Sequence, residues 1–287
     1  MAKAARGKPE AAQAEERRDV ATTQQPTPSG VRALSAEDMA DIAGVEGAGL
    51  SQNVDDRGTP LLYIAQKSSP QVNRKESSYI EGLEVGMAFN NLTGRFWDAE
   101  NAGMPMLPCF FRANWVEWTP RDAGGGFQGM HPRDTPLQDK CRAVEGRRDQ
   151  LDMPNGNRLV LTHHYFCIIA ETLQPIIVPM SSTNLGASRR LQALIGEQRG
   201  SGPDGRLVQL PGYVNIYNFK TVWDSNDQGD WYKWAPTIMS ENNDRQLMSL
   251  CREFALICKK GDVEIARPID ESGGASGDAM GSKDAPI

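Results

Sequence analysis

The fold is decided by residues 162–241, which read THHYFCIIAETLQPIIVPMSSTNLGASRRLQALIGEQRGSGPDGRLVQLPGYVNIYNFKTVWDSNDQGDWYKWAPTIMSE. Two β-rich runs, residues 163–170 and 174–181, precede a helical pattern, and two more, 213–223 and 230–239, flank a turn-rich segment. The order strand, strand, helix, strand, strand predicts a mainly β, α+β fold. We expect either an OB-like barrel or a half-open antiparallel sheet.

Two helices are expected to pack on this sheet. The first, residues 182–198, starts at hydroxyl residues that can cap free N–H groups, and its apolar face carries Ala187, Leu191, Leu194 and Ile195. The second, residues 244–260, has an apolar face made of Leu247, Leu250, Cys251, Phe254 and either Ile257 or Cys258. Gly261 can end the second helix.

The chain divides by composition into three parts. Residues 1–58 form a disordered arm with a short helix after Ser35, and residues 59–260 form a β-rich globular core. Within the core, residues 106–120 are the most aromatic strand candidate, and residues 137–151 are expected to form a short helix. Residues 261–287 have the composition of a flexible acidic tail.

Composition and charge exclude several classes of protein. The chain has 287 residues, of which 39% are apolar and 24% charged, as in ordinary soluble domains. No apolar run is long enough to span a membrane, and the start lacks the apolar stretch of a secretory signal, so we expect a cytoplasmic protein. The core carries a net charge of +1 against −6 for the whole chain, which argues against a DNA-condensing protein but permits local basic patches.

Metal binding and catalysis find little support in the residues. His163, His164 and Cys167 are close in sequence, but adjacent strand residues face opposite sides, and no paired zinc-ligand spacing occurs. We therefore expect no metal and no cofactor. The chain also lacks a G-x-S-x-G motif, a phosphate-binding loop and a defined acid–base pair, so we expect no enzyme activity.

Aromatic and basic residues are interleaved on the strand candidates. Single-stranded nucleic acid is bound by aromatic rings that stack on bases and by Arg and Lys along the backbone. In residues 230–236, Trp231 and Lys233 share one strand face, whereas Tyr232 and Trp234 share the other. The alternative is that these aromatics belong to the core, which we expect for at least half of them. The candidate nucleic-acid-binding residues are Arg112, Trp115, Trp118, Arg121, Arg189, Arg190, Lys220, Trp231 and Lys233.

Two resemblances add to this interpretation. The end of the chain, Asp284 to Ile287 after a Gly/Ser-rich acidic linker, resembles the tail of bacterial single-stranded DNA-binding proteins. That resemblance implies docking of partner enzymes and competition with DNA. Residues 59–239, through runs such as TPLLYIAQKSSPQV, LPCFFRANWVEWTPRDAGGGF and VPMSSTNLGASRRLQALI, resemble bacteriophage proteins of replication and recombination genes. Members of that class with a suggested role resemble single-stranded DNA-binding proteins of the OB-barrel kind.

The sequence thus predicts a non-catalytic phage protein that binds single-stranded DNA in replication or recombination, with replication or recombination proteins as partners of the tail. The alternative is a phage structural or assembly protein with no nucleic-acid role, whose arms order against neighbouring subunits. Neither alternative determines the oligomeric state, and both are compatible with a homo-oligomer.

Overall fold

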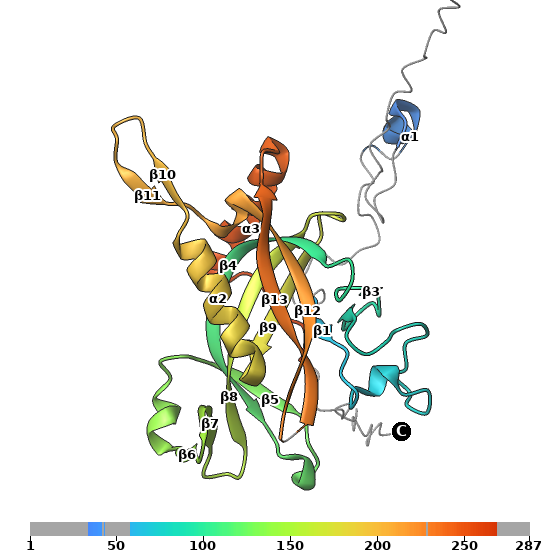
Figure 1. Cartoon of the computed structure of the whole chain (residues 1–287), viewed down its shortest axis with the longest axis vertical. Helices are drawn as coiled ribbons and strands as arrows, with labels where there is room; N and C mark the ends of the chain where they lie inside the picture. Colours follow the sequence, from blue (N-terminus) through green and yellow to red (C-terminus); the bar gives the residue numbers. More distant parts are fainter. Residues whose placement is uncertain (1–33, 42, 44–57, 228, 269–287) are drawn as a thin grey trace, which may run out of the picture.

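The computed structural model describes residues 34–41, 43, 58–227 and 229–268. The expected disorder of residues 1–30 lies outside the described residues, as do residues 269–287 of the expected acidic tail at 261–287. The described chain is mainly β, as predicted, with antiparallel pairing between its main strands (Figure 1). No helix in the described ranges is both long enough and apolar enough to cross a membrane.

The main sheet has eight strands, six of which follow the order β13-β12-β4-β8-β7-β6, while β5 pairs with β4 and β9 with β8. Their bounds are β4 (Met104–Trp118), β5 (Phe127–Pro132), β6 (Arg142–Val144), β7 (Arg147–Asp152), β8 (Arg158–Ile169), β9 (Pro175–Ser181), β12 (Asn215–Asn226) and β13 (Gly229–Glu241). The described strands do not close into a barrel, so the OB-like alternative is not confirmed. The half-open sheet is the form observed.

The central strand β4 owes its shape to Pro108. Proline has no N–H to donate to a ladder, so inside a sheet it is found at bulges or edges. The register with β8 shifts between Pro108 and Phe110, which makes Cys109 the extra residue. After this bulge, Phe110 and Arg112 lie on the same side of the sheet as Leu107, which precedes the bulge, and Cys109, which forms it.

The expected helix at residues 137–151 is wrong. A short 3-10 helix, η4 (Pro136–Lys140), is followed by the β6–β7 hairpin, in which Val144 pairs with Arg147. The two residues between them include Gly146 at φ +70°, a left-handed conformation that glycine adopts without strain. Pairing of β7 with β8 then holds this segment extended.

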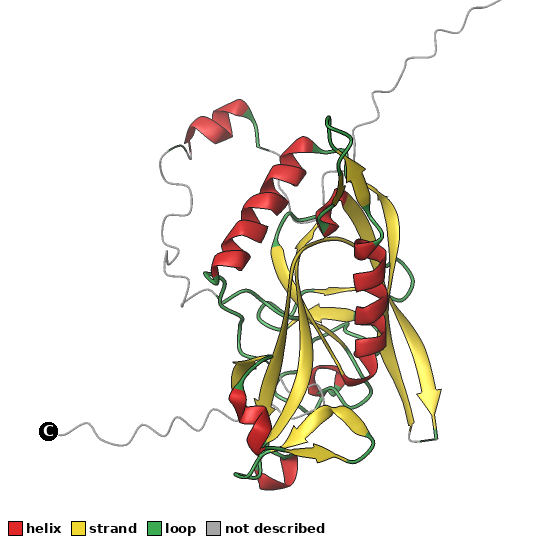
Figure 2. Cartoon of the chain, turned by 90° about the vertical axis from the view of Figure 1, so that its left-hand side faces the viewer, coloured by secondary structure: helices red, strands yellow, loops and turns green. Residues whose placement is uncertain are grey.

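Two helices cover opposite faces of the sheet. Helix α2 (Leu185–Gly196) packs on one face, where the Ser188 hydroxyl lies 2.7 Å from that of Tyr165. Helix α3 (Arg245–Lys260) packs on the other face against Phe166. Figure 2 shows these two helices on either side of the strands. Both helices were predicted, and the bounds differ from the expected ones by a few residues at most.

The start of α3 is fixed by Asp244, and its end by Gly261, as expected. The Asp244 carboxylate accepts hydrogen bonds from the N–H groups of Gln246 and Leu247, at 2.8 and 3.1 Å. Gly261 ends the helix in the left-handed conformation at φ +90°. An N-cap acceptor of this kind satisfies donors that the helix itself leaves free.

Replacing Asp244 by Ala should therefore lower the free energy of unfolding by about 1 kcal/mol, the usual contribution of an N-cap side chain. Urea unfolding followed by circular dichroism measures this change. Asp244→Asn is the matched control, because Asn keeps an acceptor oxygen and should stay close to the wild type. Equal losses for both variants would mean that the cap contributes through its charge.

Smaller elements complete the described chain. A three-stranded sheet is formed by β1 (Leu62–Ile64), β2 (Ala88–Asn90) and β3 (Phe96–Trp97). A two-stranded hairpin of β10 (Arg199–Ser201) and β11 (Leu207–Gln209) projects from the body (Figure 1, orange). The short helices are α1 (Ala36–Asp41), η2 (Pro70–Val72), η3 (Arg121–Ala123), η5 (Ser182–Asn184) and η6 (Gly212–Val214).

The chain stays in contact with the core beyond the expected boundary at residue 260. Thr59 and Ile265 form a parallel bridge, and the Asn91 side chain donates to the carbonyl of Arg267 at 3.2 Å. Val263 and Ala266 are buried. The first eight residues after α3 therefore bring Pro268 back to the face of the sheet that α3 covers.

Candidate functional site

One face of β8 is apolar at one end of the strand and more polar at the other. Phe166 and Ile168 are buried under α3, in an apolar cluster that also includes Phe254. On the same face, at the other end of the strand, Arg158 and Thr162 are not covered by α3 and line a pocket of about 750 Å³. The pocket therefore lies on the part of this sheet face that α3 does not cover.

The floor of this pocket comes from neighbouring strands. Val116 of β4 lies opposite Val160 of β8, and Thr162 of β8 lies opposite Ser181 of β9. All four residues line the pocket. The floor is thus apolar at its centre and carries hydroxyl groups toward β9.

His164 lies at the inner end of the floor and is 1% exposed. Burial, helped by the nearby charge of Arg112 and by His163, lowers the pKa of His164 to about 3, so the imidazole is neutral at neutral pH. Its Nδ1 atom has no hydrogen-bond partner among the described residues. A buried polar atom without a partner is uncommon and costs stability.

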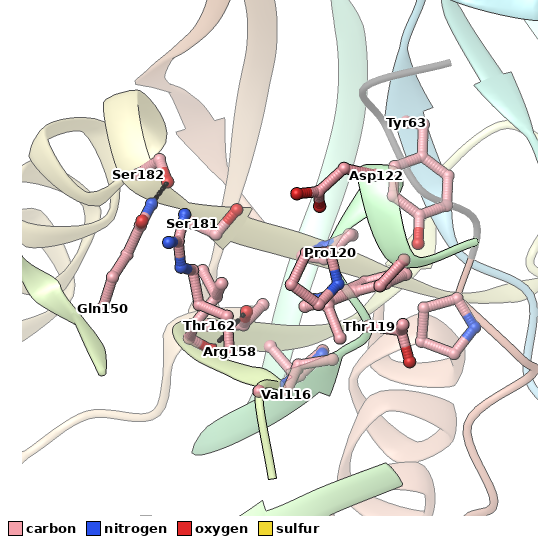
Figure 3. Close-up of a pocket in the computed structure, with 17 residues that line it drawn as sticks. Tyr63, Val116, Thr119, Pro120, Asp122, Gln150, Arg158, Thr162, Ser181 and Ser182 are labelled. Carbon is pink, nitrogen blue, oxygen red and sulfur yellow. Dashed lines mark hydrogen bonds between the residues drawn. The ribbon is translucent and has the colours of Figure 1, made fainter. Parts of the chain in front are cut away.

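Arg158 provides the positive charge of the pocket. Its Nε donates to the Asp152 carboxylate at 2.9 Å, and its side chain is 44% exposed. Figure 3 shows the guanidinium beside Ser181 and near Gln150, whose amide donates to the Ser182 hydroxyl at 3.5 Å. The guanidinium has five N–H donors, so the bond to Asp152 leaves others for a ligand.

Trp118 is the aromatic residue that lies across the ladder from Arg158. It pairs directly with Arg158 across the β4–β8 ladder, and both residues line the pocket. The indole packs edge-to-face against the ring of Phe127, and the two ring centres are 5.9 Å apart. Trp118 is half-buried.

The other predicted residues of β4 lie elsewhere. Arg112 donates to the carbonyl of Cys258 in the last turn of α3 at 3.0 Å, and its guanidinium lies 5.4 Å from the ring centre of Phe166. Trp115 is 6% exposed and donates to the carbonyl of Arg133 at 3.2 Å. These contacts hold α3 and the β5 end to the sheet, and the burial of Trp115 keeps its indole away from a ligand.

The two predicted lysines of the β12–β13 hairpin form polar contacts within the chain. Lys233 forms an ion pair with Asp224 at 2.6 Å, and Lys220 donates to the carbonyl of Asn101 at 3.1 Å. Trp231 shares a face with Lys233, as the period of two predicted, and is half-buried. Both lysines therefore have partners within the chain.

Arg189 and Arg190 are exposed on α2, on the face of the sheet opposite to the pocket. The side chain of Arg121 lies outside the described residues. The structure thus distributes the eight predicted residues whose side chains it describes over several surfaces and brings only Trp118 of these into the pocket.

Arg158, His164 and Asp122 were not among the predicted residues, although they line the pocket. A signal for the first two existed in the alternation of β8, where Arg158, Val160, Thr162 and His164 share one face. That face turns from polar to apolar in mid-strand, which indicates a sheet covered over only part of its length. No comparable signal marked Asp122.

The two adjacent histidines face opposite sides, as predicted. His163 Nδ1 lies 2.6 Å from the Ser188 hydroxyl of α2, whereas His164 faces the pocket. The described part of the chain holds no group of three His, Cys, Asp or Glu side chains able to hold a metal ion.

Comparison with known proteins gives one family. Neither the curated proteins nor the solved structures contain a match to this chain. Residues 27–264, which include the pocket-forming strands and both long helices, match the family described as Pam3 phage gp34-like protein. The chain therefore belongs to the Pam3 phage gp34-like family and is a bacteriophage protein.

Proposed function

We propose that this phage protein binds single-stranded DNA, without catalysis, through the pocket at the uncovered end of the sheet. The observation that carries the proposal is the pairing of Trp118 with Arg158 in one pocket. An indole can stack on an unpaired base, and the adjacent guanidinium can bind the phosphate of the same strand. A duplex hides its base faces, so single strands should bind in preference.

The surroundings of this pair support the proposal. The hydroxyls of Ser181 and Thr162 can donate to phosphate or sugar oxygens. Val116 and Val160 provide an apolar floor under a base. We place the activity in phage DNA replication or recombination in the host cytoplasm, with the residues beyond Pro268 as the candidate contact for partner proteins.

The test is fluorescence anisotropy with a labelled single strand and the matching duplex, at low and physiological salt. Trp118→Ala should weaken binding of the single strand by about 1–3 kcal/mol, the range for one stacking platform. Arg158→Gln should weaken binding and reduce the salt dependence by about one phosphate contact. Indole fluorescence should be quenched on binding.

Trp223→Ala is the matched control, because Trp223 is 56% exposed on the β12–β13 hairpin and does not line the pocket. It should bind like the wild type. Circular dichroism of each variant separates lost binding from lost fold. If the wild type forms no complex with single strands at low salt, the proposed function is wrong.

A second candidate function is favoured by the β10–β11 hairpin. Leu207 and Val208 on this hairpin are 71% and 42% exposed, and the hairpin projects from the body (Figure 1). Exposed apolar residues on a projecting ribbon suit a contact between subunits of an assembly. A structural or assembly role is therefore the alternative, and it predicts concentration-dependent oligomers that Leu207→Ser weakens.

A further inference from the structure

The pocket has charges of opposite sign on two of its walls. Arg158 enters from β8, and Asp122 enters from η3, the short helix that follows β4. Figure 3 shows the carboxylate of Asp122 directed into the same space as the guanidinium of Arg158. A ligand that fills this space therefore meets a cation at one end and an acceptor-only group at the other.

The size of the pocket fits a single nucleotide unit. Its volume of about 750 Å³ lies in the range of small-molecule sites, which are too small for a duplex. A nucleotide with its phosphate at Arg158 and its base over Trp118 would have the far edge of its base toward the wall that carries Asp122. In the reverse orientation the phosphate would lie beside the Asp122 carboxylate and away from the guanidinium, whereas the Asp152 carboxylate near the other end is already paired with Arg158.

We propose that the pocket holds one nucleotide of a bound single strand with the edge of its base at Asp122, and thereby prefers bases with an exocyclic amino group. This inference rests on the proposed function. An ionised carboxylate can only accept hydrogen bonds, so it pairs with the N4 amino group of cytosine, as acidic side chains do in base readout. Uracil and thymine present a carbonyl oxygen at that position and would be repelled.

The floor agrees with this orientation. The centre of the floor is apolar, and His164 at its inner end is neutral, so nothing there competes with Arg158 for the phosphate. Stacking on Trp118 alone would make binding indifferent to the base, because every base has a π-face. The preference is therefore a property of Asp122 and can be tested apart from binding itself.

The experiment compares strands of deoxycytidine and deoxyuridine of equal length at neutral pH. These bases have the same ring size and no methyl group, so stacking area is matched, and they differ at the N4 amino group and the adjacent N3 position. The wild type should bind the deoxycytidine strand about tenfold more tightly, which is within the range for one specific contact. Asp122→Asn should remove most of this difference, mainly by binding deoxyuridine better, because an amide can donate to a carbonyl.

Asp139→Asn is the control, because Asp139 is exposed on η4 and does not line the pocket. It should keep the tenfold preference of the wild type. Equal binding of the two strands by the wild type would overturn this inference and leave the proposed function standing. A preference that survives Asp122→Asn would overturn the assignment to Asp122. Failure of both strands to bind would overturn the inference and the proposed function together.

Discussion

Replacing Phe166 by Ala should lower the free energy of unfolding by about 3–5 kcal/mol, the usual range for a buried Phe. Phe166 is 0% exposed and lies between the sheet and α3. Its ring packs edge-to-face against that of Phe110, with the two ring centres 5.8 Å apart. The Arg112 guanidinium lies 5.4 Å from the ring centre of Phe166. The substitution leaves a cavity and also removes the surface on which Arg112 rests, so the attachment of α3 should weaken.

Urea unfolding followed by circular dichroism and intrinsic fluorescence measures this loss. The control is Leu207→Ala on the exposed β10–β11 hairpin, where the change should stay within about 0.5 kcal/mol. A loss of less than about 1 kcal/mol for Phe166→Ala would contradict the packing of α3 on this face of the sheet.

The elements that were predicted correctly are those whose signals are local. Helix α3 has an apolar face at helical spacing, an N-cap residue in Asp244 and a C-terminal glycine in Gly261. The β12–β13 hairpin joins two β-rich runs through a turn-rich segment. In each case the residue propensities, the hydrophobic period and the end residues all indicate the same element, and tertiary packing is consistent with it.

The segment 137–151 shows how a local signal can mislead. Its Lys, Arg, Glu, Gln and Leu residues all have good helix propensity, which is a weak prior over so few residues. Gly146 breaks the helical pattern at the point where the β6–β7 turn forms. Pairing with β8 then contributes more than propensity, because β7 lies beside a strand that is already held on its other side by β4.

The candidate site could be predicted only in part for a related reason. Arg112, Lys220 and Lys233 look alike in sequence, yet each has a partner that only the folded chain brings near, and none of the three lines the pocket. Arg158 is also paired, but its partner Asp152 leaves donors free beside Trp118. Which basic residue stays available is decided by tertiary contacts and not by residue type.

The stability of the protein should fall in mild acid because of His164. Burial, Arg112 and His163 lower the pKa of His164 from 6.5 to about 3. Below about pH 6.5 the imidazole takes up a proton in the unfolded state but not in the folded state. Protonation therefore stabilises the unfolded state relative to the folded one. The free energy of unfolding should drop by about 1.4 kcal/mol for each pH unit between 6.5 and 3, or about 2 kcal/mol at pH 5.

The variant His164→Gln isolates this contribution, because Gln is polar, neutral and does not titrate. Chemical denaturation of both proteins at about pH 7.5 and pH 5 should show a smaller acid loss in the variant, by about 2 kcal/mol. His163→Gln is the matched comparison, since His163 is the adjacent residue on the opposite face, is only partly buried and also has a lowered pKa, owing first to burial. It should remove a smaller part of the acid loss. An unchanged difference between the two pH values in His164→Gln would mean that His164 takes up its proton in the folded protein, and the pocket would then have a charged floor.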